Sequence, residues 1–266
     1  MKNKLFALLF ALLIFTTTSC SQNNSQPQED NQNSVIETTE LTEPPTENPL
    51  DGKTADDFVF TELEYQVPYH GSFLITEEKN NEQDTARCRL PQLDLEIGDA
   101  SEINQEIHNE LDRIFEYYKT IDPSVYYSGG RVDYLCYLNS SVLSLVIESR
   151  STDTPNSYFY VYNIDVLTGK RLDNEELINL STVSVNEAYG LLYNVIESKY
   201  TDIQGDWVSD EMLEDIKERS LSNSNIECSG FYFNNEGKLA VTYRYNWFAG
   251  AENYGDVCTL DASIKL

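Results

Sequence analysis

The chain has 266 residues, and its 45 Asp and Glu against 18 Lys and Arg give a formal net charge of −27. So acidic a chain repels nucleic-acid phosphates and anionic lipid headgroups, which argues against both as partners. It would attract a cationic partner, and simple solubility is the alternative explanation of the charge. Hydrophobic residues make up 40% of the chain and aromatic residues 12%, the composition of a folded domain rather than of a wholly disordered protein.

The first 19 residues have the order of a bacterial signal peptide, with a basic start at Lys2 and Lys4 and an apolar run over 5–15. The run of 11 residues is well short of the roughly 20 that cross a bilayer as a helix. Cys20, directly after this segment, resembles the lipobox cysteine of bacterial lipoproteins, which is lipidated and becomes the mature N-terminus. The resemblance implies a protein held by its lipid, a palmitate-type acyl anchor, on the extracellular face of the cell membrane. An ordinary cleaved signal and an uncleaved anchor are the alternatives.

Residues 20–57 are predicted to be a disordered acidic tether. They are rich in Ser, Gln, Asn, Glu, Thr and Pro, and no aromatic residue occurs between Phe15 and Phe58. Such a segment buries too little apolar surface to offset the entropy of ordering the chain. Three of the basic and nine of the acidic residues precede Phe58, which leaves −21 for residues 58–266.

The folded part is predicted to begin with strands at 58–69, 71–76 and 85–96, where Pro91 marks an edge or a break. A helix follows, because apolar residues recur at helical spacing; Asp99 or Ser101 can cap it, and Asp122-Pro123 ends it. Its apolar stripe consists of Ile103, Ile107, Leu111, Ile114, Phe115 and Tyr118.

Three more strands are predicted at 131–139, 141–149 and 157–166, and the last two are apolar on both faces, as central strands are. A turn at 167–170 comes next, and then a helix in which Ser184 and Glu187 form a capping box. A shorter helix near 209–219 and a meander complete the chain. The strands of the meander are predicted at 227–233, 238–248 and 256–262.

This order of segments predicts an α+β fold with a mainly antiparallel sheet, two long amphipathic helices and one shorter helix. We divide it into a small companion subdomain, 58–125, and a main domain, 126–266.

The stretch from Ser144 to Ile178 contains an aliphatic strand, a strand that ends in Asp165-Val166-Leu167-Thr168-Gly169-Lys170, and a helix led by Glu175 and Glu176. This pattern resembles a domain of unknown function in cell-surface proteins of Gram-positive bacteria. Carriers of that domain include the lysozyme-sensing ectodomain of the anti-sigma-V factor and the N-terminal region of a peptidoglycan deacetylase. The stretch 86–114 is similar to the companion domain that often precedes it. The resemblance implies recognition of a wall glycan or of a cationic wall-degrading protein.

Catalytic motifs are absent from the sequence, which has no H-E-x-x-H, G-x-S-x-G or S-x-x-K. The two histidines, His70 and His108, are expected to face solvent. The acid pairs Glu175-Glu176 and Asp210-Glu211 are expected at helix N-termini rather than in acid–base catalysis. The sequence therefore predicts a non-catalytic protein without a metal or another cofactor. A carboxylate-dependent hydrolase and an accessory lipoprotein of an envelope complex are the alternatives.

Two further sets of residues are candidates for disulfides and for a ligand site. Outside the cell, four cysteines could form two disulfides in any of three pairings, although lone buried thiols are equally ordinary in strands. These are Cys88, Cys136, Cys228 and Cys258. Trp247, Tyr245 and Tyr254 flank a loop near the last hairpin and are candidates for stacking on sugar rings or for anchoring a protein, with a place in the sheet core as the alternative.

Overall fold

The computed structural model describes residues 49–68, 74, 85–118, 120, 131–150, 157–201, 208–247 and 254–265. All of them belong to Glu47–Leu266, the second of the two compact units into which the chain divides. The signal segment, Cys20, most of the tether, His70 and the strand expected at 71–76, apart from one residue, lie outside the described residues.

The fold is α+β with antiparallel sheets, as the sequence predicts. A two-stranded sheet pairs β1 (Val59–Pro68) with β2 (Thr85–Leu93). A four-stranded sheet has the order β3 (Arg131–Asn139), β4 (Val142–Arg150), β5 (Ser157–Asp165) and β6 (Lys170–Leu172). A three-stranded sheet has the order β7 (Gly230–Phe233), β8 (Lys238–Tyr245) and β9 (Tyr254–Ser263). The helices are α1 (Ala100–Tyr118), α2 (Asn174–Asn179), α3 (Val185–Ser198), α4 (Asp210–Ser220) and α5 (Asn223–Ile226), with a 3-10 turn η1 (Ala55–Asp57).

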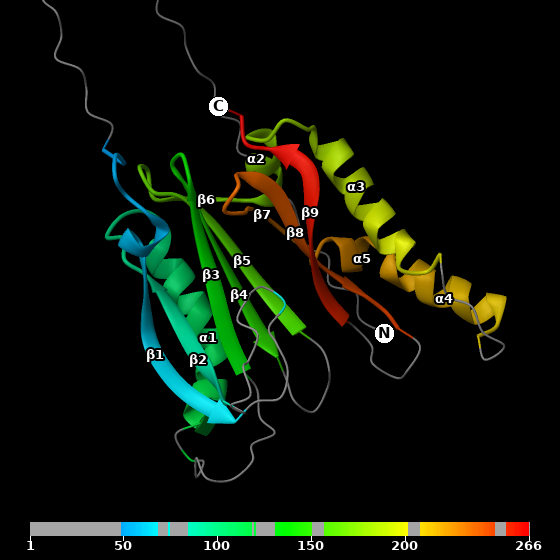
Figure 1. Ribbon diagram of the computed structural model, residues 1–266, viewed down its shortest axis with the longest axis horizontal. Helices are drawn as coiled ribbons and strands as arrows, with labels where there is room; N and C mark the ends of the chain where they lie inside the picture. The colour runs from blue at the N-terminus through cyan, green and yellow to red at the C-terminus, as the bar shows by residue number, and fades with distance from the viewer. Residues whose placement is uncertain are drawn as a thin grey trace, which may run out of the picture. The chain divides into compact units, whose positions relative to one another are not determined.

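The four-stranded sheet is covered on both faces (Figure 1). On one face, Leu143, Leu145 and Ile147 of β4 pack with α1 and β2 in the first core. On the other face, Val146 packs against Tyr232 and Ala240 of the three-stranded sheet. The outer face of that second sheet packs against α2, α3, α4 and α5 in a separate core. The prediction that β4 and β5 are central strands is therefore confirmed, because β4 lies between β3 and β5 and β5 between β4 and β6.

Two polar residues of the central strands join the sheets. The hydroxyl of Ser144 donates to Asn163 Oδ1 at 2.7 Å and accepts the Phe233 amide at 3.2 Å. The Asn163 amide donates to the Phe231 carbonyl at 2.8 Å. Asn174 Oδ1 accepts the Phe231 amide at 3.1 Å. These side chains form hydrogen bonds with the backbone amides and carbonyl on the edge of β7 that does not pair with β8. That edge therefore needs no further strand.

Helix α1 forms where its apolar stripe predicts, and Ile103, Ile107, Leu111 and Phe115 are at most 1% exposed. Asn104 fixes α1 to the end of β2, because its side chain accepts from the Leu93 amide at 2.8 Å and donates to the Leu93 carbonyl at 3.0 Å.

The Asp165 to Lys170 segment is a turn that docks on the start of α1. Asp165 Oδ1 accepts the amides of Leu167 and Thr168, and Gly169 has a φ of +71°. Gly98, with a φ of +63°, lies directly against Gly169, and the Asp99 amide donates to the Gly169 carbonyl at 2.8 Å. A Cβ added to Gly98 would lie 2.1 Å from that carbonyl oxygen. The glycines are therefore required by the close approach of two backbones.

Several boundaries differ from the expectation. The folded part reaches into the end of the predicted tether, because Leu50 and Ala55 pack against the first core and Thr54 and Asp57 form a capping box at η1. Residues 223–226 form α5, so β7 starts at Gly230 rather than at 227. Pro91 lies opposite Thr61, beside a register irregularity of the β1–β2 pair, which confirms the predicted break.

The four cysteines that the sequence left open for disulfides are not joined in disulfides in the structure. They are separated by the architecture. Cys88 is buried in the first core and Cys136 packs against that core, whereas Cys258 packs against the second core. Cys228 is exposed after α5, and its Sγ donates to the Ser224 carbonyl.

Candidate functional site

The three aromatic residues that the sequence singled out lie together at the end of the β8–β9 hairpin. Tyr245 and Tyr254 are direct cross-strand partners with ring centroids 5.7 Å apart. Trp247 meets Tyr245 edge to face at 6.1 Å. All three side chains are half-buried, and Tyr245 and Trp247 pack against the second core. One side of the cluster therefore belongs to the core and the other is accessible, and the role in ligand binding stays a prediction. We name Tyr245, Trp247 and Tyr254 the aromatic edge.

A charged pair lies beneath the aromatic edge. Lys199, just after α3, places its ammonium 2.5 Å from Asp256 Oδ2 on β9. The same ammonium lies 5.3 Å from the Tyr245 ring centroid and 5.8 Å from that of Tyr243, within range of a cation–π attraction. The Tyr243 hydroxyl donates to Asp256 Oδ2 at 3.1 Å. Burial raises the pKa of Tyr245 and of Tyr243, so both hydroxyls stay protonated at neutral pH.

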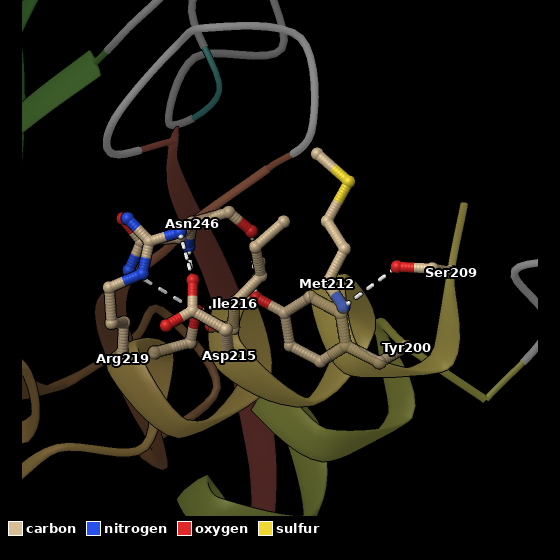
Figure 2. A network of polar contacts seen from close by, with 8 residues as sticks. Tyr200, Ser209, Met212, Asp215, Ile216, Arg219 and Asn246 are labelled. Carbon is tan, nitrogen blue, oxygen red and sulfur yellow. Dashed lines mark hydrogen bonds and ion pairs between the residues drawn. The ribbon is translucent and has the colours of Figure 1, made fainter. Parts of the chain in front are cut away.

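A buried polar network holds the end of β8 in place (Figure 2). The Tyr200 hydroxyl donates to the Asn246 carbonyl at 2.7 Å and lies 2.5 Å from the hydroxyl of Ser220, which is fully buried. Ser220 Oγ also accepts the Asn246 amide at 2.8 Å. Because Asn246 precedes Trp247, these bonds to α4 and to Tyr200 fix where the tryptophan leaves the sheet.

Helix α4 has a hydrogen-bonded cap at its N-terminus and an ion pair on its surface. The Ser209 hydroxyl accepts the Met212 amide at 3.2 Å. Arg219 pairs with Asp215 at 2.9 Å, one turn away (Figure 2). The Met212 side chain is 42% exposed, so α4 presents an apolar group outside the network.

Sequence reasoning found the aromatic edge but missed its support. Lys199, Tyr200 and Ser220 lie on or beside two helices that are far from β8 in the chain, and no local pattern links them to Trp247. The predicted positions of the paired acids are confirmed, because Glu175 and Glu176 lie in the first turn of α2, and Asp210 and Glu211 in that of α4. His108 is only partly exposed. Its ring is 31% exposed and is held 2.8 Å from both Glu62 of β1 and Asp112 of α1.

The buried carboxylates of the central sheet have structural partners. Asp133 and Glu148 lie opposite each other on β3 and β4 and are 3% and 0% exposed. Asp133 accepts from Arg89 at 2.6 Å. Glu148 accepts from the Leu74 amide at 2.7 Å and from the Ser157 hydroxyl at 2.5 Å. Each of these buried carboxylates therefore accepts hydrogen bonds from within the fold, as buried polar groups usually do.

Within the described residues, no group of three or more His, Cys, Asp and Glu side chains is arranged to bind a metal ion. Among the helices that the structure describes, none is long and apolar enough to cross a membrane. No family model matches the chain, and no curated protein matches it either.

Proposed function

We propose that this chain is a lipid-anchored cell-surface protein whose folded part recognises a cationic protein of the envelope environment, such as a wall-degrading lysozyme. The observation that supports it most is the charge of −21 on residues 58–266, beside an accessible aromatic edge. Charge of one sign steers an oppositely charged partner into contact, and half-buried Trp and Tyr side chains are the residue types that dominate protein interfaces.

The chemistry of the aromatic edge supports a role in binding. Tyr245 and Tyr254 stack on each other and Trp247 is fixed by the Asn246 network, so little side-chain entropy is lost when a partner covers them. The resemblance to the lysozyme-sensing domain points to the same class of partner. Cys20 is the proposed attachment site, and labelling of cells with a palmitate analogue tests it, because Cys20→Ala abolishes the label if the cysteine is lipidated.

The experiment uses hen egg-white lysozyme as the cationic probe and residues 21–266, which lack both the apolar signal segment and the proposed lipid attachment site. Affinity is measured by titration calorimetry at low and high salt. We expect binding that weakens with salt, and we expect Trp247→Ala to reduce it by about tenfold or more, as for an interface hot spot.

Phe60→Ala is the matched control, because Phe60 is an aromatic side chain that is 42% exposed on β1, outside the aromatic edge. Equal losses from the two variants, or an affinity that salt does not change, would contradict the proposal. Sedimentation with insoluble peptidoglycan tests whether the ligand is wall glycan instead. Salt-resistant sedimentation in the absence of lysozyme would replace the protein partner by wall glycan.

A further inference from the structure

A polar cleft of about 280 Å³ lies between the end of the four-stranded sheet and the start of β7. Its described lining includes Asn163, Asn174, Cys228, Ser229, Gly230 and Thr242. At about 30 Å³ per water molecule, the cleft has the volume of roughly nine waters. This is room for one small ligand, of the size of a single sugar ring, and too little for a folded partner. None of the residues of the aromatic edge lines it.

The walls of the cleft are fixed by hydrogen bonds that use most of their polar side chains. Asn163 donates to the Phe231 carbonyl and Asn174 accepts from the Phe231 amide. Asn174 also donates to the Ser229 carbonyl at 2.9 Å. The Thr242 hydroxyl accepts the Gly230 amide at 3.3 Å. A Cβ on Gly230 would lie 2.5 Å from Val161 Cγ2, so β7 begins in close contact with β5. The cleft is therefore formed before any ligand arrives, as small-molecule sites usually are.

Ser229 differs from the other polar residues of the described lining, because its side chain takes no part in the hydrogen bonds that hold the walls. The residue is 4% exposed, and its hydroxyl makes no hydrogen bond to any of the residues that the structure describes. A buried hydroxyl without a partner destabilises the fold by the desolvation that nothing offsets. Rotation about the Cα–Cβ bond to another staggered position redirects the hydroxyl without moving the backbone. A ligand hydroxyl or amide in the cleft would then provide the missing partner.

The charges around the cleft decide which ligand fits. Arg171 is the cationic residue of the described lining, and its guanidinium is committed to Glu106 at 2.8 Å and to the face of Tyr162. Asp173, also in the lining, uses its carboxylate to cap α2 through the Glu176 amide. An anionic ligand would therefore lose its hydration without gaining a cation, whereas an uncharged ligand loses little.

We propose that this cleft binds one neutral monosaccharide unit, held by hydrogen bonds that include the Ser229 hydroxyl. The site is separate from the aromatic edge, so its failure would leave the proposed function intact. Ligands of this size bind proteins at about millimolar concentration.

Cys228 provides a reporter that the protein already carries. Its thiol is exposed and lines the cleft. Burial raises the pKa of Cys136 and of Cys258 to about 11, and Cys88 is fully buried, so these three thiols react slowly. The full chain is alkylated for a limited time with N-ethylmaleimide, and mass spectrometry of its peptides quantifies the modification at Cys228 alone.

The probes are glucose, N-acetylglucosamine and glucuronate, which has the size of glucose and a negative charge. We expect the two neutral sugars to slow alkylation of Cys228, with half-maximal protection near about 1 mM, and glucuronate to protect poorly. We expect Ser229→Ala to raise the half-protecting concentration about 2- to 10-fold, the loss of one hydrogen bond. Ser198→Ala, which removes an exposed hydroxyl on α3, is the control and should change nothing.

Three results would overturn the proposal: no protection by either neutral sugar, equal protection by glucuronate, or identical behaviour of the two serine variants. The thermal midpoint of Ser229→Ala shows whether the variant is folded, and removing an unsatisfied hydroxyl should leave it unchanged or raised. A trimer of N-acetylglucosamine distinguishes the source of the sugar. Stronger protection by the trimer than by the monomer identifies a glycan end, and equal or weaker protection identifies a free sugar.

Discussion

Because Gly98 lies against Gly169, we expect substitution of Gly98 to destabilise the fold in two ways, through its backbone conformation and through a steric clash. Gly98→Ala places a side chain at a φ of +63°, which disfavours an L-residue by about 1–2 kcal/mol. The new Cβ also lies 2.1 Å from the Gly169 carbonyl oxygen, so the backbones must separate. That separation weakens the bond from the Asp99 amide, which contributes about 0.5–1.5 kcal/mol. The lower entropy of alanine in the unfolded chain offsets about 0.4–1 kcal/mol.

We therefore expect Gly98→Ala to lower the free energy of unfolding by about 1–3 kcal/mol, the balance of these effects. For a domain of this size, each kcal/mol corresponds to about 2–4 °C in the thermal midpoint. Urea and thermal denaturation followed by circular dichroism measure both quantities.

Gly52→Ala is the matched control. Gly52 has a φ of +78° but would place its Cβ in open space. It carries the conformational penalty without the clash, so we expect a loss of about 0–1.5 kcal/mol. Equal losses at Gly52 and Gly98 would refute the reasoning, because the close approach of the two backbones would then contribute nothing.

Three further variants test other parts of the fold. Gly190 is exposed in α3 with open space around it, so Gly190→Ala should stabilise the protein by about 0.5–1 kcal/mol in urea denaturation; a loss would show an unrecognised contact. Tyr200→Phe removes the hydroxyl bonded to the Asn246 carbonyl and should lower stability by about 1–3 kcal/mol and shift tryptophan fluorescence; an unchanged midpoint would contradict the network. The hydrogen bond to Asp112 raises the pKa of His108 above 6.5, so its stabilisation is full below that pH and is lost as pH rises through the folded-state pKa. Urea midpoints of wild type and His108→Gln should converge as pH rises, and parallel curves would exclude this linkage.

The sequence was sufficient to predict helices that are determined by residues close together in the chain. The stripe from Ile103 to Phe115 predicts α1, and the capping box of Ser184 and Glu187 predicts the start of α3, where both hydrogen bonds are present. The Asp165 turn was recognised from its motif, but its partner Gly98 was not. That contact joins residues 71 positions apart, and nothing near Gly98 indicates it.

The same limit applies to the site and to the cores. Ser144 and Asn163 are polar residues within apolar strands because they bind the backbone of β7. Their partners there lie 89 and 68 residues later in the chain. The aromatic edge was visible as a cluster in sequence, whereas its support from Lys199 and Tyr200 depends on packing between α3 and β8. The cleft at Ser229 had no sequence signal, since serine and asparagine are ordinary in loops.

Strand β9 has a consequence for the order in which the molecule can assemble during synthesis. It pairs with β8 along most of its length, and Leu260 and Ala262 complete the second core. Val257 packs against Val146, Tyr232 and Ala240, where the four-stranded and three-stranded sheets meet. The residues that complete these two sets of contacts are therefore made after every other helix and strand that the structure describes. Until they arrive, β8 presents an unpaired edge, which is a template for aggregation. A nascent chain that stalls before Tyr254 therefore exposes this edge, although every other strand and helix that the structure describes has already been made.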